Sequence, residues 1–419
     1  MHLKINYPPE VVRIAEILAE NHYKAYAVGG CMRDALMGRK PNDWDMTTDC
    51  SPEKMLEIFD SAGLRTIPTG LKHGTVSVLL NGELYECTTF RIDGSYTDSR
   101  HPDKVTFTKD VTEDLRRRDF TVNAIAGDPI VGDPIASDPI AGDVTAGDAA
   151  VGGQGSGKNE IIDVFGGRED IERKIIRAVG DPETRFTEDA LRILRAIRFA
   201  TVLDFTIEKD TFLAAIKLGS RLQSVSAERK SVELQKILLS PHADRGISLL
   251  LEADLARYVH PEIGAPEVAL STLPASFPVR LAALFRSVPD LSCMKLSGEV
   301  VKSTCLLRND ELYKETCTRF SCRGATARLM LSKYGEIAED AALLRGDRAL
   351  AESITEERKR VPCISLKQLA VNGNDLISAG LPARQLGGIM NALLEAVIED
   401  QSRNQKETLI EAARSLLSH

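Results

Sequence analysis

YAVGGCMRDALMGRKPNDWDMTTD, the segment Tyr26–Asp49, predicts a strand, a tight turn and a helix in that order. An apolar run at 26–28 leads into Gly29 and Gly30, and an apolar periodic segment that includes Arg33 follows. Glycines allow backbone N–H groups to come close to a phosphate, and the positive end of the following helix would point at it. Gly30 and Arg33 are therefore candidate residues for binding a phosphorylated nucleotide.

Two acidic residues close this segment. Asp43 and Asp45 stand one residue apart, and on a β-strand this spacing places both carboxylates on the same side. Two such carboxylates can share Mg²⁺, which prefers oxygen ligands and commonly accompanies triphosphates. Asp43 and Asp45 are thus candidate catalytic and metal-binding residues. The alternative, two solvated loop acids, is disfavoured because the pair follows the glycine turn in this order.

This combination resembles motif A of the polymerase-β-like nucleotidyltransferases, in the branch that holds class II tRNA CCA-adding enzymes and bacterial poly(A) polymerases. A second segment, Arg-Arg-Asp-Phe-Thr-Val-Asn-Ala at 117–124, matches the motif B of that family. Guanidinium groups match phosphate oxygens, so Arg118 is a further candidate for holding the triphosphate. The alternative is a plain charged helix start.

A third carboxylate is expected on a strand next to the two aspartates. Alternating residues at 75–80 and 84–90 flank Asn81-Gly82, which predicts a hairpin whose second strand carries Glu86. The family resemblance implies a catalytic acid on this strand, which makes Glu86 the candidate. An ordinary exposed glutamate is the alternative.

The segment Thr187–Ala200 predicts one helix with an apolar face and a polar ridge of Asp189, Arg192, Arg195 and Arg198. Cytosine and adenine each present an amino donor beside a ring-nitrogen acceptor, and uracil and guanine present the reverse. An aspartate can accept from the amino group while an arginine donates to the ring nitrogen. Asp189 and Arg192 would then select CTP and ATP without a template, with Arg195 and Arg198 in support. A solvated basic face is the alternative, but Glu-Asp-x-x-Arg after motif B resembles the family pattern.

Two segments are expected to be loops. Residues 91–105 are rich in turn formers and charges, and they resemble the flexible loop that the family links to addition of the final A; a solvated loop would look similar. Residues 127–160 repeat Asp-Pro and Gly every five residues and are predicted to be a low-complexity insertion in a hairpin tip, without a catalytic role.

Composition sets further bounds. The 419 residues carry a net charge of −8, of which the insertion contributes −5, so the remaining −3 is compatible with a localised basic groove for RNA. Eight scattered cysteines form no Cys-x-x-Cys pair and are expected to be reduced thiols. No apolar stretch approaches the ~18 residues of a membrane span, and the N-terminus lacks a signal-peptide core, so the expected location is the cytoplasm.

The expected architecture is α+β. A polymerase-β-like nucleotidyltransferase head with a mixed sheet covers 1–175, an all-helical, nucleotide-selecting neck 176–240, and a helical, tRNA-binding body and tail 241–419. The resemblance implies Mg²⁺-dependent addition of CCA to the tRNA 3′ end from CTP and ATP, with no membrane and no obligatory protein partner. Rival readings are a poly(A) polymerase or an enzyme that adds only A, and an RNA-binding protein on a degenerate transferase fold.

Overall fold

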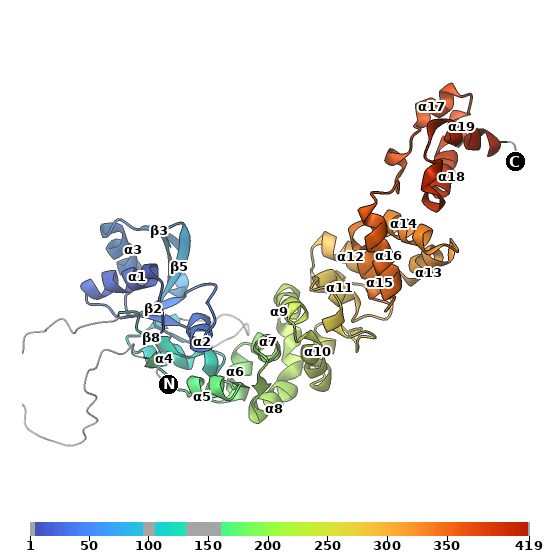
Figure 1. The fold of residues 1–419 in the computed structure, drawn as a ribbon. Coiled ribbons are helices and arrows are strands. Elements are labelled where there is room, and N and C mark those ends of the chain that lie inside the picture. The colour runs from blue at the N-terminus through green and yellow to red at the C-terminus, as the bar shows by residue number, and fades with distance from the viewer. Residues whose placement is uncertain (1–4, 95–104, 131–160, 418–419) are drawn as a thin grey trace, which may run out of the picture. The chain divides into compact units, whose positions relative to one another are not determined.

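The computed structural model describes residues 5–94, 105–130 and 161–417 (Figure 1). The chain divides into two compact units, Met1–Val225 and Ser226–His419. The first unit combines a sheet with helices, and the second is built from helices. This confirms the predicted fold class, an α+β part followed by helices. The finer division into head, neck, body and tail stays a prediction.

A mixed sheet forms the centre of the first unit. Among the described residues its strands lie in the order β3-β4-β5-β2-β1-β8-β9. The β2–β5 pair is parallel, and the other neighbouring pairs are antiparallel. The bounds of the strands are β1 Ala25–Val28, β2 Met46–Thr48, β3 Arg65–Gly70, β4 Thr75–Leu80, β5 Glu83–Thr89, β8 Ala126–Gly127 and β9 Ile161–Ile162.

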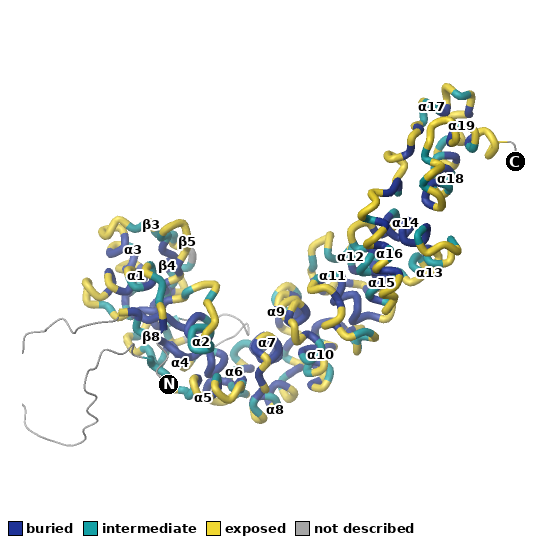
Figure 2. The backbone as a smooth tube through the Cα atoms, in the orientation of Figure 1, coloured by how far each residue is buried: buried dark blue, intermediate teal, exposed yellow. Residues whose placement is uncertain are grey.

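Helices and two small strand pairs complete this unit. The apolar faces of α1 and α3 are buried in a core with β1, β4 and β5 (Figure 2). The helices are α1 Pro9–Glu20, α2 Gly30–Leu36, α3 Pro52–Ser61, α4 Val111–Arg116, α5 Gly167–Glu172, α6 Pro182–Glu188, α7 Leu191–Leu203 and α8 Lys209–Leu218, and the strand pairs are β6 Arg91–Asp93 with β7 Val105–Phe107 and β10 Ile175–Ile176 with β11 Thr206–Ile207. The all-helical expectation for 176–240 is wrong at β11, which pairs in parallel with β10.

Local signals in the sequence produced the expected turns. Asn81 and Gly82 both have positive φ, 52° and 86°, which closes the β4–β5 hairpin with Leu80 opposite Glu83. The predicted hairpin around the insertion is confirmed at its base, because β8 and β9 pair antiparallel on either side of it. Residues 131–160 of the insertion and 95–104 of the predicted loop lie outside the described residues. The loop expected at 91–105 is wrong at its two ends, because β6 covers Arg91–Asp93 and β7 begins at Val105.

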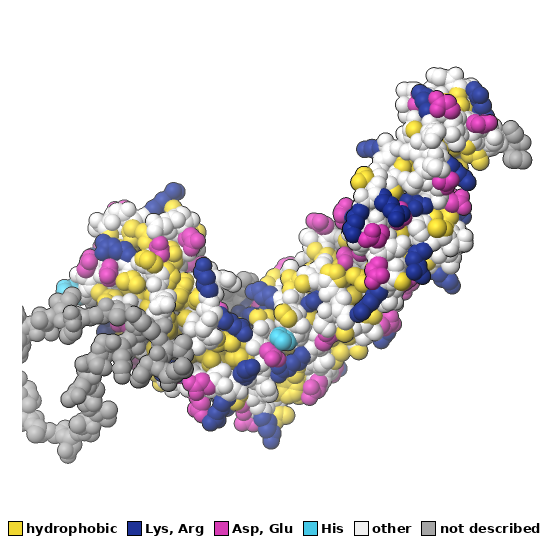
Figure 3. Space-filling model, in the orientation of Figure 1, with side chains coloured by type: hydrophobic (Ala, Val, Ile, Leu, Met, Phe, Trp, Pro, Cys, Tyr) yellow, Lys and Arg dark blue, Asp and Glu magenta, His cyan; other side chains and the backbone are white. Residues whose placement is uncertain are grey.

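The second unit contains the helices α9 Ala227–Leu239, α10 Ala243–Glu252, α11 Phe277–Ala282, α12 Gly298–Leu307, α13 Asp310–Thr318, α14 Arg323–Tyr334, α15 Ala338–Leu343, α16 Arg348–Lys359, α17 Gly373–Ser378, α18 Leu386–Glu399 and α19 Lys406–Ser415. Lys and Arg side chains are interspersed with Asp and Glu on the face of this unit seen in Figure 3. All eight cysteines lie in described segments and are free thiols, as expected. Among the described residues no helix is both long and apolar enough to cross a membrane.

Candidate active site

The two candidate metal-binding aspartates lie at the N-terminal end of β2. Asp43 and Asp45 stand just before the strand and not within it, which corrects the expectation that both lie on a strand. The Val28 N–H still donates to the Asp45 carbonyl at 2.9 Å, so the backbone of Asp45 continues the pairing of β1 with β2. In the parallel β2–β5 pair Met46 is opposite Cys87, which brings Asp45 beside Glu86 of β5.

The electrostatics of Asp45 show that these acids act on one another. Burial of its carboxyl, together with Asp43 and Glu86, raises the pKa of Asp45 to about 6, although Arg118 lowers it. Because Asp45 is among the exposed residues, water screens part of this effect. A surplus of negative charge at one point suits a divalent cation, which would relieve the repulsion.

The number of metal ligands is limited. Among the described residues no group of three or more acidic, histidine or cysteine side chains is arranged to hold a metal ion. Asp43 and Asp45 offer two carboxylates, and a divalent ion such as Mg²⁺ is commonly bound through one or two carboxylates with waters and substrate phosphates as further ligands. That the ion is Mg²⁺ stays a prediction. Glu86 neighbours the pair as an exposed residue, and its catalytic role stays a prediction.

Arg118 lies over the glycine turn. A Cβ atom placed on Gly29 would come within 2.9 Å of Arg118 Nη1, and Gly29 has a φ of 85° that other residues rarely adopt. Arg118 Nε is buried, and in the described part of the chain it has no hydrogen-bond partner. Buried polar atoms are normally paired, so this nitrogen fits an anionic ligand at the turn.

The guanidinium of Arg33 is already engaged. It donates from Nη1 to Asn123 Oδ1 at 2.6 Å and from Nε to Asp34 at 2.9 Å, and it lies 5.3 Å from the centre of the Phe199 ring. Arg33 thus joins α2 to motif B and to α7. Gly30 is the first residue of α2, so of the two glycines expected in the turn only Gly29 precedes the helix. For Gly30 and Arg33, phosphate binding stays a prediction.

The single helix expected for 187–200 is wrong. Asp189 has extended backbone angles, φ −139° and ψ 104°, and separates α6 from α7. Its Oδ1 accepts from the N–H of Leu191 at 3.0 Å. Side chains such as aspartate favour helix ends because they satisfy the backbone N–H groups there.

The backbone N–H of Arg192 donates to the Asp189 carbonyl at 3.0 Å, but its guanidinium group bonds to other residues. Its Nη1 donates to Glu188 Oε2 at 2.6 Å, and its Nη2 donates to the carbonyl of Arg117 at 2.9 Å. The structure therefore places Arg192 against motif B. It does not join the side chains of Asp189 and Arg192 to each other, so their joint selection of the base stays a prediction.

An ion pair fastens α7 to motif B. Arg195 Nε donates to Asp119 Oδ2 at 2.7 Å, and Asp119 Oδ1 accepts from Asn123 Nδ2 at 3.2 Å. Burial alone would raise the pKa of Asp119, but Arg195, the bond from Asn123 and Arg192 lower it to about 2. Asp119 and Asn123 lie in motif B but are not among the predicted site residues. The sequence does not reveal their contacts, because their partners Arg195 and Arg33 are distant along the chain.

Three arginines surround the ring of Phe199. Arg198 lies 3.8 Å, Arg33 5.3 Å and Arg195 5.4 Å from its centre, within the range of cation–π attraction. The ring also meets Phe120 of motif B edge-on at 5.6 Å. The predicted residues on α2, in motif B and on α7 are thus in one continuous set of contacts.

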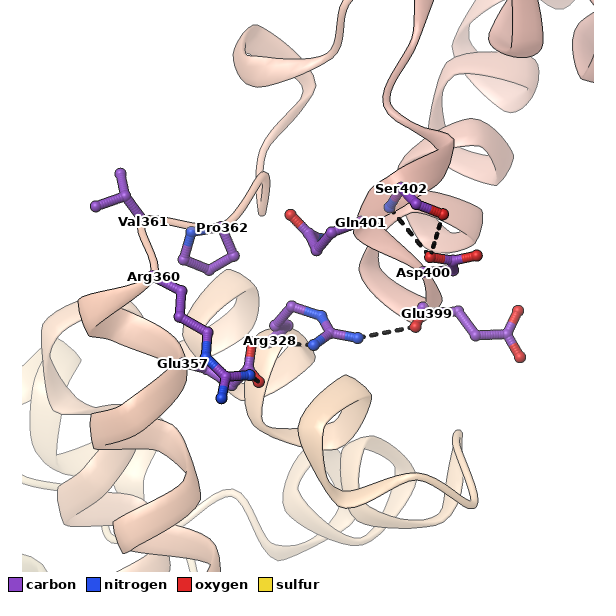
Figure 4. A pocket seen from close by; sticks show the side chains of 9 residues that line it. All are labelled: Arg328, Glu357, Arg360, Val361, Pro362, Glu399, Asp400, Gln401 and Ser402. Atoms are coloured by element: carbon purple, nitrogen blue, oxygen red, sulfur yellow. Dashed lines mark hydrogen bonds and ion pairs between the residues drawn. The ribbon is translucent and has the colours of Figure 1, made fainter.

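The second unit contains a pocket that is lined by none of the residues predicted for the active site. It lies between the end of α16 and the end of α18, and Figure 4 shows Arg328 at its base. Arg328 donates to Glu357 and to the carbonyls of Ile398 and Glu399, so its side chain joins α14 to α16 and to the end of α18. We assign this pocket to the packing of these helices.

Comparison with known proteins agrees with this geometry. Residues 25–177 match the model of the poly A polymerase head domain, 204–265 that of the RNA and SrmB-binding site of polymerase A, and 295–413 that of tRNA nucleotidyltransferase domain 2. The CCA-adding enzyme of Lactiplantibacillus plantarum is 34% identical over 96% of this chain and 94% of its own length. The chain belongs to the family of the CCA-adding enzymes. The CCA-adding enzyme of Geobacillus stearothermophilus is 35% identical over 96% of both chains.

A solved CCA-adding enzyme shares the whole fold. The crystal structure of the Bacillus stearothermophilus CCA-adding enzyme in complex with CTP matches with a TM-score of 0.76 at 32% identity, covering 99% of this chain and 100% of the other. Nucleotidyltransferases of this family generally use a divalent metal ion. Asp43 and Asp45, at the start of β2, are the candidate residues for holding one.

Proposed function

We propose that this protein adds C, C and A to the 3′ end of tRNA from CTP and ATP, without a template and with release of pyrophosphate. The observation that carries the proposal is a series of interactions: Arg118 acts electrostatically on Asp45, and Arg192 and Arg195 of α7 bond to Arg117 and Asp119 of the same motif B. Its relatives are named for CCA addition, and the solved relative was crystallised with CTP.

In this proposal the tRNA 3′-hydroxyl attacks the α-phosphate of the nucleotide. Asp43 and Asp45 would hold Mg²⁺, which when bound activates the hydroxyl and stabilises the leaving oxygen. Arg118 would bind the triphosphate through the accessible edge of its guanidinium group, since its side chain is 21% exposed. Glu86 beside Asp45 adds negative charge that favours the cation.

Base selection falls to Asp189 and Arg192. Asp189 would accept from the amino group of cytosine or adenine, and Arg192 would donate to the ring nitrogen. UTP and GTP would leave these groups unpaired, at a cost of about 1–3 kcal/mol for each buried polar group. The hydrogen bond from Arg192 to the Arg117 carbonyl supports the proposal, because it fixes the selecting residue beside motif B.

The remaining assignments follow from the reaction. The helices of the second unit, with Lys and Arg on their surface, would bind the tRNA backbone. Mature tRNA is needed for translation, so we place the protein in the cytoplasm.

A nucleotide-incorporation assay tests the proposal. Purified protein is given tRNA transcripts lacking CCA or ending in CC, with each nucleotide alone and with CTP and ATP together. Two C residues and then one A are expected, with no product from UTP or GTP. Runs of A on any RNA would instead show a poly(A) polymerase, and A added only to transcripts ending in CC would show an A-adding enzyme. An Asp43→Ala variant as active as the wild type would contradict the metal-binding role.

A further inference from the structure

We propose that Asp114 is a positioning residue for nucleotide binding, which orients Arg117 and Arg118 so that they meet the triphosphate. Asp114 lies on α4, upstream of the two arginines, and has no assigned role. This inference rests on the proposed function, because it names a further residue of the same site.

The Asp114 carboxylate is saturated with donors. Its Oδ1 accepts from Arg117 Nη2 at 2.7 Å, from Arg117 Nε at 3.0 Å and from the N–H of Arg91 at 3.3 Å. Its Oδ2 accepts from Arg118 Nη2 at 3.4 Å and lies 3.3 Å from Thr47 Oγ1, whose single proton is shared between Asp114 and the Thr88 carbonyl at 3.1 Å. A single side chain thus contacts both arginines, the strand that follows Asp45, and the start of β6.

Asp114 is a buried charge, and its burial places it behind the two arginines. Its side chain is fully buried, with 0% exposure, whereas those of Arg117 and Arg118 are 18% and 21% exposed. Burial would raise the pKa of Asp114, but Arg117 and Arg118 lower it, so the group is ionised at neutral pH. A buried carboxylate behind two partly exposed guanidinium groups fixes their orientation from below and leaves their outer edges accessible.

The contact to Thr47 links the two halves of the site. Thr47 is a fully buried residue of β2, two positions after Asp45. Through Thr47, Asp114 ties the arginines that would bind the triphosphate to the strand that carries the metal-binding acids. Their spacing matters because in-line attack requires the α-phosphate at a fixed distance from the metal.

Kinetics of an Asp114→Asn variant test the proposal. The asparagine keeps the size of the side chain but removes the charge, so Arg117 and Arg118 lose their orientation. The KM values for CTP and for ATP should both rise about tenfold or more, and by the same factor, because the triphosphate is common to both. The kcat should fall by less than the KM rises. Asp110→Asn is the matched control, since Asp110 is an exposed cap at the start of the same helix.

A double-mutant cycle separates positioning from general stability. If Asp114 acts through the two arginines, then Asp114→Asn in an Arg117→Ala/Arg118→Ala background should change the KM by less than about twofold. If the KM increases of the single variants multiply in the combined variant, the proposal is overturned. A lower kcat with an unchanged KM would also overturn it, because that is the result expected from a merely structural role. Because KM does not depend on the fraction of active protein, partial unfolding would not mask the outcome.

Two further measurements keep the inference testable. If Asp114→Asn does not fold, Thr47→Val removes one anchor of Asp114 and should raise both KM values in the same direction, by a smaller factor. Equilibrium titration with CTP or ATP, followed by the fluorescence of Trp44, the single tryptophan of the chain, measures binding without turnover. Wild-type protein that binds but does not incorporate nucleotide would defeat the proposed function, and equal binding by wild type and Asp114→Asn would defeat this inference.

Discussion

At the scale of single residues, the carboxylates of Asp43, Asp45 and Glu86 repel one another, and a bound cation would relieve this repulsion. Asp45 is close enough to Asp43 and Glu86 for their charges, after its own burial, to raise its pKa. Metal-free protein therefore carries an unfavourable charge at this point when Asp45 is ionised. The same arrangement that weakens the apoprotein creates affinity for a divalent ion.

The repulsion should make the stability of the metal-free protein depend on pH. Because the pKa of Asp45 is raised from 3.8 to about 6 in the folded state, its ionisation destabilises the metal-free protein fully above pH 6 and not below pH 4. Asp45→Asn should therefore have a larger free energy of unfolding than the wild type at pH 8, and the difference should decrease as the pH falls from 6 to 4. Urea unfolding in EDTA measures it, with Asp60→Asn on the exposed side of α3 as the matched control. A difference that does not vary with pH would contradict this reading.

At the scale of elements, local chemistry explains what the sequence could predict. The Asn81-Gly82 turn and the Ser51 cap of α3, which accepts from the Lys54 N–H at 3.3 Å, depend on neighbouring residues alone. The break at Asp189 could not be predicted, because the apolar periodicity continues through it while the backbone changes. The Asp119–Arg195 ion pair joins residues 76 positions apart, a distance over which residue spacing carries no signal.

That ion pair should hold α7 to motif B. Asp119→Asn removes the charge opposite Arg195 and should lower the free energy of unfolding by about 3 kcal/mol. The low pKa of Asp119, about 2, means that this contribution is present above pH 4 and is lost as the pH falls from 4 to 2. Chemical unfolding between pH 7 and pH 2.5 checks both statements. Asp210→Asn, at an exposed position on α8, is the control, and an equal loss for both variants would contradict the role of the pair.

At the scale of the whole molecule, the second unit has its own internal joint. Arg328 of α14 is buried, pairs with Glu357 of α16 at 2.9 Å, and donates to the last carbonyls of α18. The bonds satisfy groups that a helix end leaves without partners. In this way one side chain fastens α18 to the helices before it.

Removing Arg328 should loosen this joint. Arg328→Met keeps the length of the side chain and should lower the free energy of unfolding of the second unit by about 3 kcal/mol, because Glu357 retains Arg360 as a partner. Limited proteolysis should then cut near Val361, an exposed residue with a φ of 50° between α16 and α17. Arg319→Met is the control, since its ion pair with Glu395 is exposed. Unchanged proteolysis of Arg328→Met would contradict the joint.

The central claim is that the acids at β2 and the residues at the start of α7 serve one nucleotide. The most direct test is the choice of nucleotide by Asp189→Ala on tRNA transcripts lacking CCA, measured in single turnovers with CTP, ATP, UTP or GTP in turn. The account predicts that the variant still forms the phosphodiester bond but prefers CTP and ATP over UTP and GTP at least about tenfold less than the wild type does. A variant that is as selective as the wild type would contradict it.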